Sequence, residues 1–479
     1  MDELIELYFD TFEYCYRILD YSVFKRKYES YMNSIESTEG SFLVQLLLVM
    51  TIAGPLHGDV GVRGQMDRRA HTWIHIAQTW LSGPVEKDRL SVAGIQVQCL
   101  LLLSRQVNRV GADLIWISVG SLVRMAIQVG LHQDPSQLGE MSLREREVRR
   151  RLWYSILELN VQGSLDSGVV PMVSEYDYNT QLPSDISDEH LDNVNEAEGV
   201  ARTETNVFFQ RLLAKSLPLR MRVTTHINSL NHDPTYEEVV ALGNDLTTAC
   251  REAADMVGQP FVNSFGACLC SHLLGRFALT LHFGYSIKAK TNPLYSHSQK
   301  VCLEAALDII SLLDDEVYRR ALLTGGGIFR DIVTRGALQV FLALAPDRET
   351  GGSIFARKRN RDRQEPLIQD ARRLVQYAKD RMWHGETNVK IYIFFSMMMA
   401  QAEASLDNLP IRDAATKALH ESLTTGHEIL KTLSADTSLI ELAHPDLEPW
   451  SVQSIVSSVD DDFDFLDEVN FDLPQNFFN

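Results

Sequence analysis

Apolar residues recur along most of the chain at the spacing of a helix, and the alternation typical of strands is hard to find. Between residues 115 and 127 the apolar positions follow steps of three and four, which places them on one helix face. Gly130 stands where a left-handed residue ends a helix, and Pro135 follows shortly. Ser142 and Glu145 have capping-box spacing, which predicts the start of another helix.

The same pattern predicts helices over most of the chain. Further helices are expected at 2–32, 41–53, 67–82, 90–106, 204–230, 235–257, 262–287, 298–314, 328–345, 366–383, 386–406 and 412–433. Loops are expected where helix breakers or charges cluster, at 54–64, 171–199, 325–327 and 346–366. The sequence therefore predicts an all-α fold, a large domain of stacked antiparallel helices over residues 1–433.

Charge divides the chain unevenly. Its 479 residues carry a formal charge of −19, and no Lys or Arg follows Lys431. Residues 432–479 hold eleven acidic groups, so this stretch differs in composition from the helical body. We therefore expect a linker at 434–459 and a disordered acidic tail at 460–479. A net negative chain is a poor nucleic-acid binder by itself, because phosphates repel it.

Targeting and redox signals point to an intracellular chain that does not cross a membrane. The N-terminus is acidic and lacks the positive start of a secretory signal. The apolar stretch 42–56 is interrupted by Gln45 and broken at Gly54-Pro55, short of the roughly 20 residues that a membrane helix needs. Six scattered cysteines are typical of a reducing compartment.

Candidate catalytic and metal chemistry is weak. His71 and His75 lie four residues apart on one predicted helix face, but the glutamate of a zinc protease motif and a nearby third ligand are missing. Cys268 and Cys270 lack the partner pair and the spacing of a zinc or redox site, so buried thiols are expected. We expect no catalytic residue, no metal site and no cofactor, and the sequence does not support an enzyme.

Two basic clusters have competing interpretations. Arg149, Arg150 and Arg151 point around a predicted helix, which favours ion pairs with neighbouring helices over a stripe that contacts nucleic acid. The second cluster lies in a predicted loop and indicates either a nuclear-import signal or a solvated loop. Its basic residues are Arg357, Lys358, Arg359, Arg361 and Arg363.

The tail interleaves acids with large apolar groups. The residues that carry this pattern are Asp460, Asp461, Asp462, Phe463, Asp464, Phe465, Leu466, Phe471 and Leu473. Charge repulsion keeps such a segment extended, and a partner with an apolar groove and a basic rim can order it as a short helix. A solubilising tail would not need five phenylalanines in its last twenty residues, so we expect an activation or docking segment.

Several of these features occur in the order of a known family. Residues 126–134 read AIQVGLHQD and residues 147–156 read EVRRRLWYSI, which resembles the middle homology region of fungal zinc-cluster transcription factors, the fungal-specific transcription factor domain. Gln133 and Tyr154 are mild departures from the family pattern, and the resemblance extends over 4–190. The family-motif residues are Gly130, Leu131, His132, Asp134, Arg149, Arg150, Arg151, Leu152 and Trp153.

The resemblance implies a nuclear, pathway-specific regulator that activates transcription by RNA polymerase II. The helical body would regulate transcription and form homodimers or heterodimers, and a small-molecule effector would act on it. The tail would recruit coactivators. Family members usually carry six closely spaced cysteines that bind zinc ahead of this region, whereas here the helices start near Met1. DNA binding and zinc are therefore expected only through a missing N-terminal segment, or DNA through a partner.

Two other functions remain open from the sequence. One is a small-molecule sensor or an enzyme built on the same helical scaffold, which a deep cavity with converging His, Asp or Arg groups would favour. The other is a modulator that lacks DNA binding and acts on a related factor.

Overall fold

A computed structural model describes residues 1–443 except for seven short stretches. The stretches left out are 34–38, 84–88, 192–206, 232–234, 256–262, 346–353 and 408. The first ten residues of the predicted linker, 434–443, belong to the last described helix, and the rest of the linker (444–459) and the acidic tail (460–479) lie outside the described residues.

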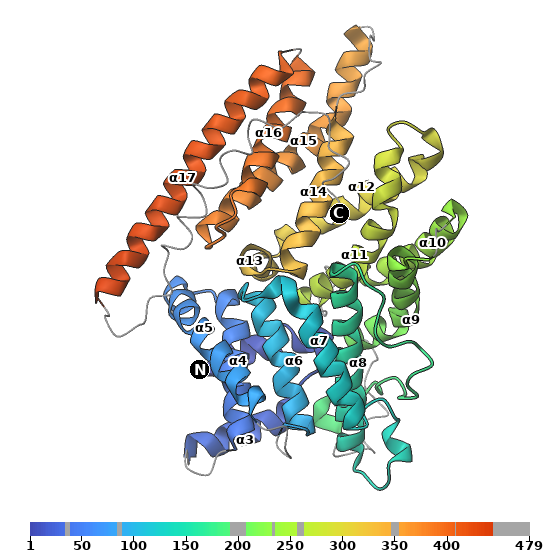
Figure 1. The fold of residues 1–479 in the computed structure, drawn as a ribbon, viewed down its shortest axis with the longest axis vertical. Coiled ribbons are helices and arrows are strands. Elements are labelled where there is room, and N and C mark those ends of the chain that lie inside the picture. Colours follow the sequence, from blue (N-terminus) through green and yellow to red (C-terminus); the bar gives the residue numbers. More distant parts are fainter. Residues whose placement is uncertain are drawn as a thin grey trace.

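The described residues form seventeen α-helices and several 3-10 turns, with no strand among them (Figure 1). The all-α prediction is confirmed. The helices are α1 (Asp2–Phe9), α2 (Glu13–Tyr16), α3 (Tyr21–Asn33), α4 (Gly40–Ala53), α5 (Val60–Ser82), α6 (Val92–Val107), α7 (Ile115–Gln128), α8 (Leu143–Asp166), α9 (Phe208–Asn228), α10 (Tyr236–Ala254), α11 (Ser264–Lys288), α12 (Ser296–Ser311), α13 (Glu316–Thr324), α14 (Ile328–Leu344), α15 (Ile354–Trp383), α16 (Lys390–Asp407) and α17 (Ile411–Ala443).

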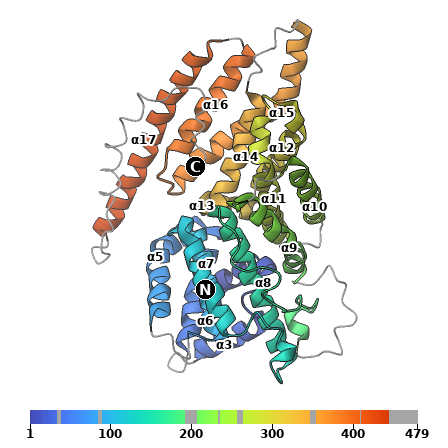
Figure 2. The same cartoon turned by 45° about the vertical axis from the view of Figure 1, so that its right-hand side comes forward.

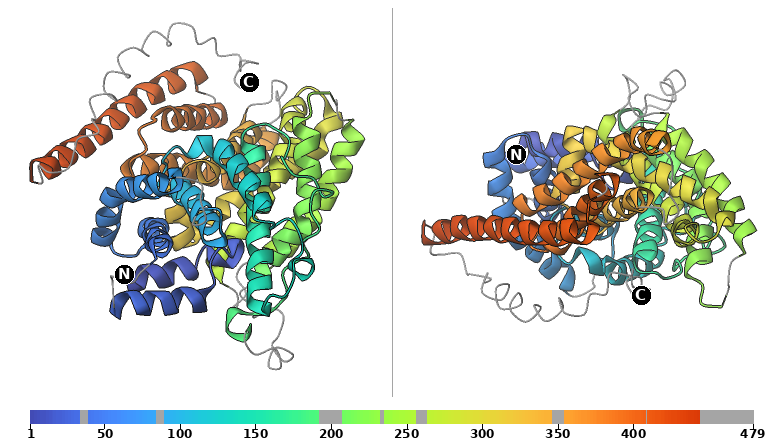
Figure 3. Two further views of the ribbon diagram at one scale, coloured as in Figure 1. Left: turned by 60° about the horizontal axis from the view of Figure 1, so that its bottom comes forward. Right: turned by 90° about the horizontal axis from the view of Figure 1, so that it is seen from above.

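The helices gather into two stacked parts. In Figures 1 and 2, α1–α8 fill the lower part, and α9–α17 extend above and to one side of it. Within the lower part α4 packs on α5 and α6, and α7 packs on α8. Helix α9 joins the parts because it contacts α8 as well as α10 and α11. Helix α17 packs mainly on α16, at the outer side of the upper part (Figure 3).

The central helices are buried on nearly every side. Every residue of α8 from Arg151 to Leu165 is buried, which a helix enclosed by neighbours requires. Helix α11 is long and apolar enough to cross a membrane, but 78% of its most apolar window is buried inside the fold. A buried core helix has the same length and apolar character. Helix α11 is longer than the apolar stretch 42–56, which the sequence pattern indicates as the longest.

Local helix signals predicted two boundaries well. Gly130 has φ +79°. Its N–H donates to the carbonyl of Ile127, and the N–H of Leu131 donates to the carbonyl of Ala126, which makes a Schellman motif after α7. Ser142 and Glu145 form the capping box before α8.

Other boundaries differ from the prediction: α13 is not among the predicted helices, and α17 continues ten residues beyond the expected end at 433. The single helix expected over 2–32 is three helices, because Arg17 takes the left-handed conformation and Glu13 accepts hydrogen bonds from the N–H groups of Ile18 and Leu19. Helix α5 begins at Val60, where Asp59 caps it, rather than near residue 67.

The prediction of a loop at 346–366 is largely wrong. Residues 354–383 form α15, with Pro366 inside the helix. Proline removes only one N–H donor, and its Arg-, Lys- and Gln-rich neighbours are good helix formers. The basic residues between Arg357 and Arg363 are therefore on a helix and not in a loop.

Candidate functional site

Three of the family-motif residues, Asp134, Arg150 and Arg151, meet in one mostly buried polar cluster, which we call the arginine clamp. Its members are Arg17, Asp134, Glu147, Arg150, Arg151 and Asp188, and all but Arg150 are buried. They come from the turn after α2, the turn after α7, helix α8 and the long segment after α8. The clamp therefore joins parts of the chain that are as many as 171 residues apart.

One half of the clamp is built on Arg150. Its Nε and Nη2 donate to the two carboxylate oxygens of Asp134, at 3.0 and 2.9 Å, and its Nη1 donates to Glu147 at 2.8 Å. Asp134 also accepts from the N–H of Gln181, and Glu147 from that of Ser184. Burial opposes ionisation of Asp134, but hydrogen bonds from Arg150 hold its pKa well below the usual range.

The other half is built on Asp188, the first residue of a 3-10 turn (Asp188–His190). Arg17 and Arg151 both donate to its Oδ1, and the N–H of Tyr21 donates to Oδ2 at 3.2 Å. Burial raises the pKa of this carboxyl, but the two guanidinium groups outweigh it and lower the pKa to about 2. Asp188 is therefore ionised across the physiological range.

A second buried carboxyl beside the clamp behaves in the opposite way. Glu13 is buried, and burial raises its pKa to about 7 although Arg17 opposes the shift. Its Oε1 accepts from Tyr8, Ile18 and Leu19, whereas no described residue donates to Oε2. Burial therefore dominates at Glu13 and raises its pKa, whereas the two guanidinium groups dominate at Asp188 and lower its pKa.

Two of the remaining motif residues hold the segment after α8 against the turn after α7. The carbonyl of Leu131 accepts from the Thr180 hydroxyl at 2.8 Å, and the carbonyl of His132 accepts from the N–H of Asn179 at 3.0 Å. Leu152 and Trp153 are fully buried. Arg150 and Arg151 pair with acids in turns rather than on neighbouring helices, and Arg150 also pairs with Glu147 on its own helix. Arg149 instead donates to the carbonyl of Val129 at 3.4 Å.

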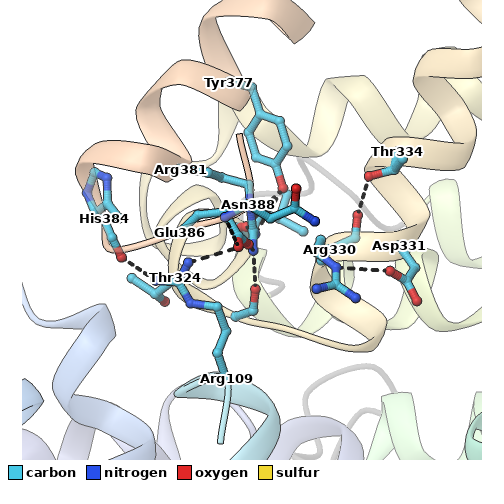
Figure 4. Close-up of polar contacts among 12 residues, drawn as sticks. Arg109, Thr324, Arg330, Asp331, Thr334, Tyr377, Arg381, His384, Glu386 and Asn388 are labelled. Atoms are coloured by element: carbon cyan, nitrogen blue, oxygen red, sulfur yellow. Dashed lines mark hydrogen bonds and ion pairs between the residues drawn. The ribbon is translucent and has the colours of Figure 1, made fainter. Parts of the chain in front are cut away.

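A second polar cluster lies where the two parts of the fold meet, and we call it the junction. It consists of Arg109, the glycine triplet 325–327, Arg381 and Glu386 (Figure 4). Arg381 donates to the carbonyl of Gly325 at 2.8 Å and to Glu386 at 3.0 Å. Arg109, which follows α6 and has φ +58°, donates to the carbonyl of His384.

The glycine triplet 325–327 is part of the contact between α14 and the turn after α6. It is not a phosphate-binding loop, because no Lys-Ser/Thr pair follows it. The N–H of Gly326 donates to the carbonyl of Gln106 at 2.8 Å. A Cβ at Gly326 would come within 3.0 Å of Ala112 and Arg109, and Gly327 has φ +53°. Glycine is needed here because α14 starts directly against the turn after α6.

The junction is electrostatically less complete than the clamp. Its single carboxylate, Glu386, lies 3.0 Å from Arg381 and 3.7 Å from Arg109. Burial, together with the positive charge of Arg381, lowers the pKa of Arg109 to about 10. No described residue accepts a hydrogen bond from Nη1 of Arg109.

A groove of about 660 Å³ lies between the segment after α8 and helices α9 and α10. Its apolar floor is formed by Val173, Met221 and Leu242, all of which are buried. Carboxylates of Glu175, Glu238 and Asp245 outnumber the guanidinium of Arg222 around it, and His226 also lines it. The residues that line the groove from the segment after α8, 171–176, lead directly into the residues held by the clamp.

The other residues singled out in the sequence form no common site among the described residues. His71 and His75 are both exposed on α5, and Cys268 and Cys270 are buried in α11. Among the residues that the structure describes, no group of three or more His, Cys, Asp or Glu side chains could hold a metal ion. The basic residues from Arg357 to Arg363 lie on α15, and their side chains are outside the description. The proposed activation residues lie outside the described residues as well.

A fully buried ion pair in the core was not predicted. Arg220 of α9 donates to both carboxylate oxygens of Glu158 of α8 at 2.7 Å, and Gln162 donates to the same carboxylate at 2.8 Å. A glutamate inside the mostly apolar run 152–161 was the available signal, since such a residue needs a partner when it is buried.

Comparisons with known proteins agree with the resemblance. The fungal specific transcription factor domain matches residues 5–230. The chain is 31% identical to transcription factor asR3 of Sarocladium schorii, over 84% of this chain and 52% of that protein. It is 32% identical to transcription factor lepE of Aspergillus flavus, over 90% and 55% of the two chains. It is 31% identical to transcription factor opdR of Penicillium oxalicum, over 97% and 62%.

The chain thus spans between about half and just over three fifths of the length of these three relatives. No solved structure matches it.

Proposed function

Residues 5–230 of this chain are a fungal-specific transcription factor domain, and from this premise we propose that the protein is a nuclear regulator of transcription. The observation that carries the proposal is the similarity to three proteins named as transcription factors, each along more than four fifths of this chain. The family and these relatives give no support to an enzyme.

The division of labour within the chain is also part of the proposal. The helical body restrains activation or transmits a signal, and it mediates dimerisation. Residues 460–479 recruit coactivators for RNA polymerase II. Phe463, Phe465 and Phe471 enter an apolar groove of the coactivator, while the acids around them accelerate encounter with its basic rim. DNA is reached through a zinc-cluster segment or through a DNA-binding partner.

A reporter assay tests this role of the tail. Residues 432–479, and separately the whole chain, are fused to a heterologous DNA-binding domain. We expect the tail to activate and the whole chain to activate less. Replacing Phe463, Phe465 and Phe471 together by Ala should reduce activation by the tail about ten-fold or more, because the anchors of the groove carry most of the binding energy.

The matched control removes two other rings from the same tail. Phe477→Ala with Phe478→Ala lies outside the acidic run and should retain most of the activity. Silence of both fusions, or equal activity of the triple variant and the parent, would refute activation by the tail. A modulator without activating power would then be the better description.

A second candidate, a small-molecule sensor, is favoured by the groove. Its volume of about 660 Å³ is within the range of ligand sites, and its apolar floor is combined with mainly acidic polar groups. An amphipathic organic cation fits this chemistry. Because residues 171–176 continue into the clamp, an occupied groove would change the position of a segment that α8 also holds.

Octylamine, octanoate and octanol serve as probes that share a chain and differ in charge. Octylamine should raise the melting temperature of the full chain more than the other two, and Asp245→Asn should remove most of this difference. Ala241→Trp should block the groove, and Ala241→Ser is its matched control. Equal shifts with all three probes, or shifts that persist in Ala241→Trp, would contradict a cation site in the groove.

A further inference from the structure

Helix α5 has an apolar ridge on its outer side. Arg69, Trp73, Ile76 and Trp80 follow one another at steps of four, three and four, which places them along one line of the helix surface. Ile76 is 42% exposed, and both tryptophans are only partly buried. This helix lies at the outer edge of the lower part of the fold (Figure 2).

Basic groups border this ridge. The guanidinium of Arg69 lies 5.9 Å from the centre of the Trp73 ring, and that of Arg89 lies 4.7 Å from the Trp80 ring. Arg68 is exposed beside them and, like Arg69, forms no ion pair with any described residue. The nearest acid in sequence, Asp67, is half a turn round the helix from Ile76.

The acidic tail has the complementary composition. Residues 460–479 contain seven acidic groups and five phenylalanines, with no basic residue. Such a segment needs an apolar surface with a basic rim, and the α5 ridge supplies both. Aromatic rings of the tail can pack on Trp73, Ile76 and Trp80, while its carboxylates meet Arg68 and Arg69.

The chain also ends within reach of this surface. Helix α17 runs back along the molecule, and its C-terminal end lies on the side of α5 (Figures 1 and 3). Sixteen residues, 444–459, separate α17 from the acidic run, and they can span at most about 50 Å when extended. A tether of this length gives the tail an effective concentration on the order of millimolar at α5. A separate partner must bind more tightly, or be more concentrated, to compete with this contact.

We propose that residues 460–479 dock on the α5 ridge of their own chain. Docking covers the same phenylalanines that the proposed function assigns to coactivator binding, so α5 and the coactivator compete for them. The regulatory consequence rests on that proposed function, whereas the docking itself does not.

Photo-cross-linking in the full-length chain tests the docking. Benzoylphenylalanine is incorporated at position 471, and the irradiated protein is digested and mapped by mass spectrometry. We expect cross-links to peptides within α5, in a product with the mass of one chain. Arg68→Glu combined with Arg69→Glu should lower their yield about five-fold or more, because two attractive charges become repulsive.

Two further variants separate charge from packing and from general effects. Ile76→Ser keeps every charge and should also lower the yield. Lys25→Glu with Arg26→Glu makes the same change of charge at two consecutive exposed residues of α3 and should leave the yield unchanged.

Cross-links outside α5, or an α5 yield that is insensitive to the Arg68 and Arg69 reversal, would overturn the proposal. A product with the mass of two chains would also overturn it, since the tail would then bind a second copy. The result is independent of the reporter assay: a tail that cross-links to α5 but does not activate refutes the proposed function alone.

Discussion

The clamp and the junction both combine arginine with carboxylate, but Arg109 and Glu386 of the junction are only partly buried, and the two clusters differ in how completely the charges are matched. In the clamp, Asp134 and Asp188 each accept from arginine and from backbone N–H groups. Arg17 and Arg151 share Asp188, but the clamp as a whole sets three carboxylates against three arginines. The junction has only the carboxylate of Glu386 for its two arginines. Burial lowers the pKa of Arg109 to about 10 and also lowers the pKa of Arg151 in the clamp, so the clusters differ in their number of carboxylates and not in the direction of this shift.

The difference reflects what each cluster connects. The clamp lies within the domain matched at residues 5–230 and holds the segment after α8 on that helix. The junction joins the turn after α6 to the turn between α15 and α16, which are 275 residues apart in the chain. We infer that the clamp is a permanent part of the domain, and that the junction is where the two parts of the fold separate first.

The largest expected effect breaks the clamp. Asp188→Asn removes the anion that Arg17 and Arg151 share and leaves two buried cations without it. We expect the free energy of unfolding to fall by about 3–5 kcal/mol, because an unpaired buried charge is more costly than the loss of one contact. Urea unfolding followed by circular dichroism measures this change.

Asp113→Asn is the matched control. It makes the same chemical change at an exposed aspartate that lies 2.9 Å from Arg330, and exposed pairs contribute at most about 1 kcal/mol. If Asp188→Asn were no more destabilising than this control, the clamp would not hold the domain together.

A smaller and more local effect is expected at the junction. Glu386→Gln removes the charge that Arg109 and Arg381 share while keeping the shape, and we expect a loss of about 1–3 kcal/mol. Hydrogen exchange should accelerate in residues 377–390 and 322–330 and remain unchanged in 130–190.

Glu403→Gln serves as the control for this experiment, because Glu403 is an exposed carboxylate that pairs with Arg372 on the surface of the upper part. Exchange that accelerates equally in the clamp would contradict the distinction between the two clusters.

The sequence predicted the local features of the fold, such as helix caps, but not the pairings between distant residues. The Schellman motif at Gly130 and the capping box at Ser142 depend on residues within six positions of one another, so the pattern alone identifies them. The α2 boundary was missed because it depends on Glu13 being buried, and burial is a tertiary property.

The arginine triplet was recognised as important without its partners. Arg150 and Arg151 stand next to each other, yet one pairs with Asp134 and the other with Asp188. The glycine triplet was seen only as a loop, because the turn after α6 that requires it lies more than 200 residues earlier in the chain.

By itself, the sequence determined the all-α class, the position of most helices and the resemblance of residues 4–190 to the family whose domain matches residues 5–230, since these depend on periodicity, capping and motif order. Only the tertiary structure decided which charges are buried together, where the groove opens, and that Trp73, Ile76 and Trp80 border exposed arginines. The physical reason is that the ionisation of a side chain and the exposure of a ring depend on neighbours that folding brings from elsewhere in the chain.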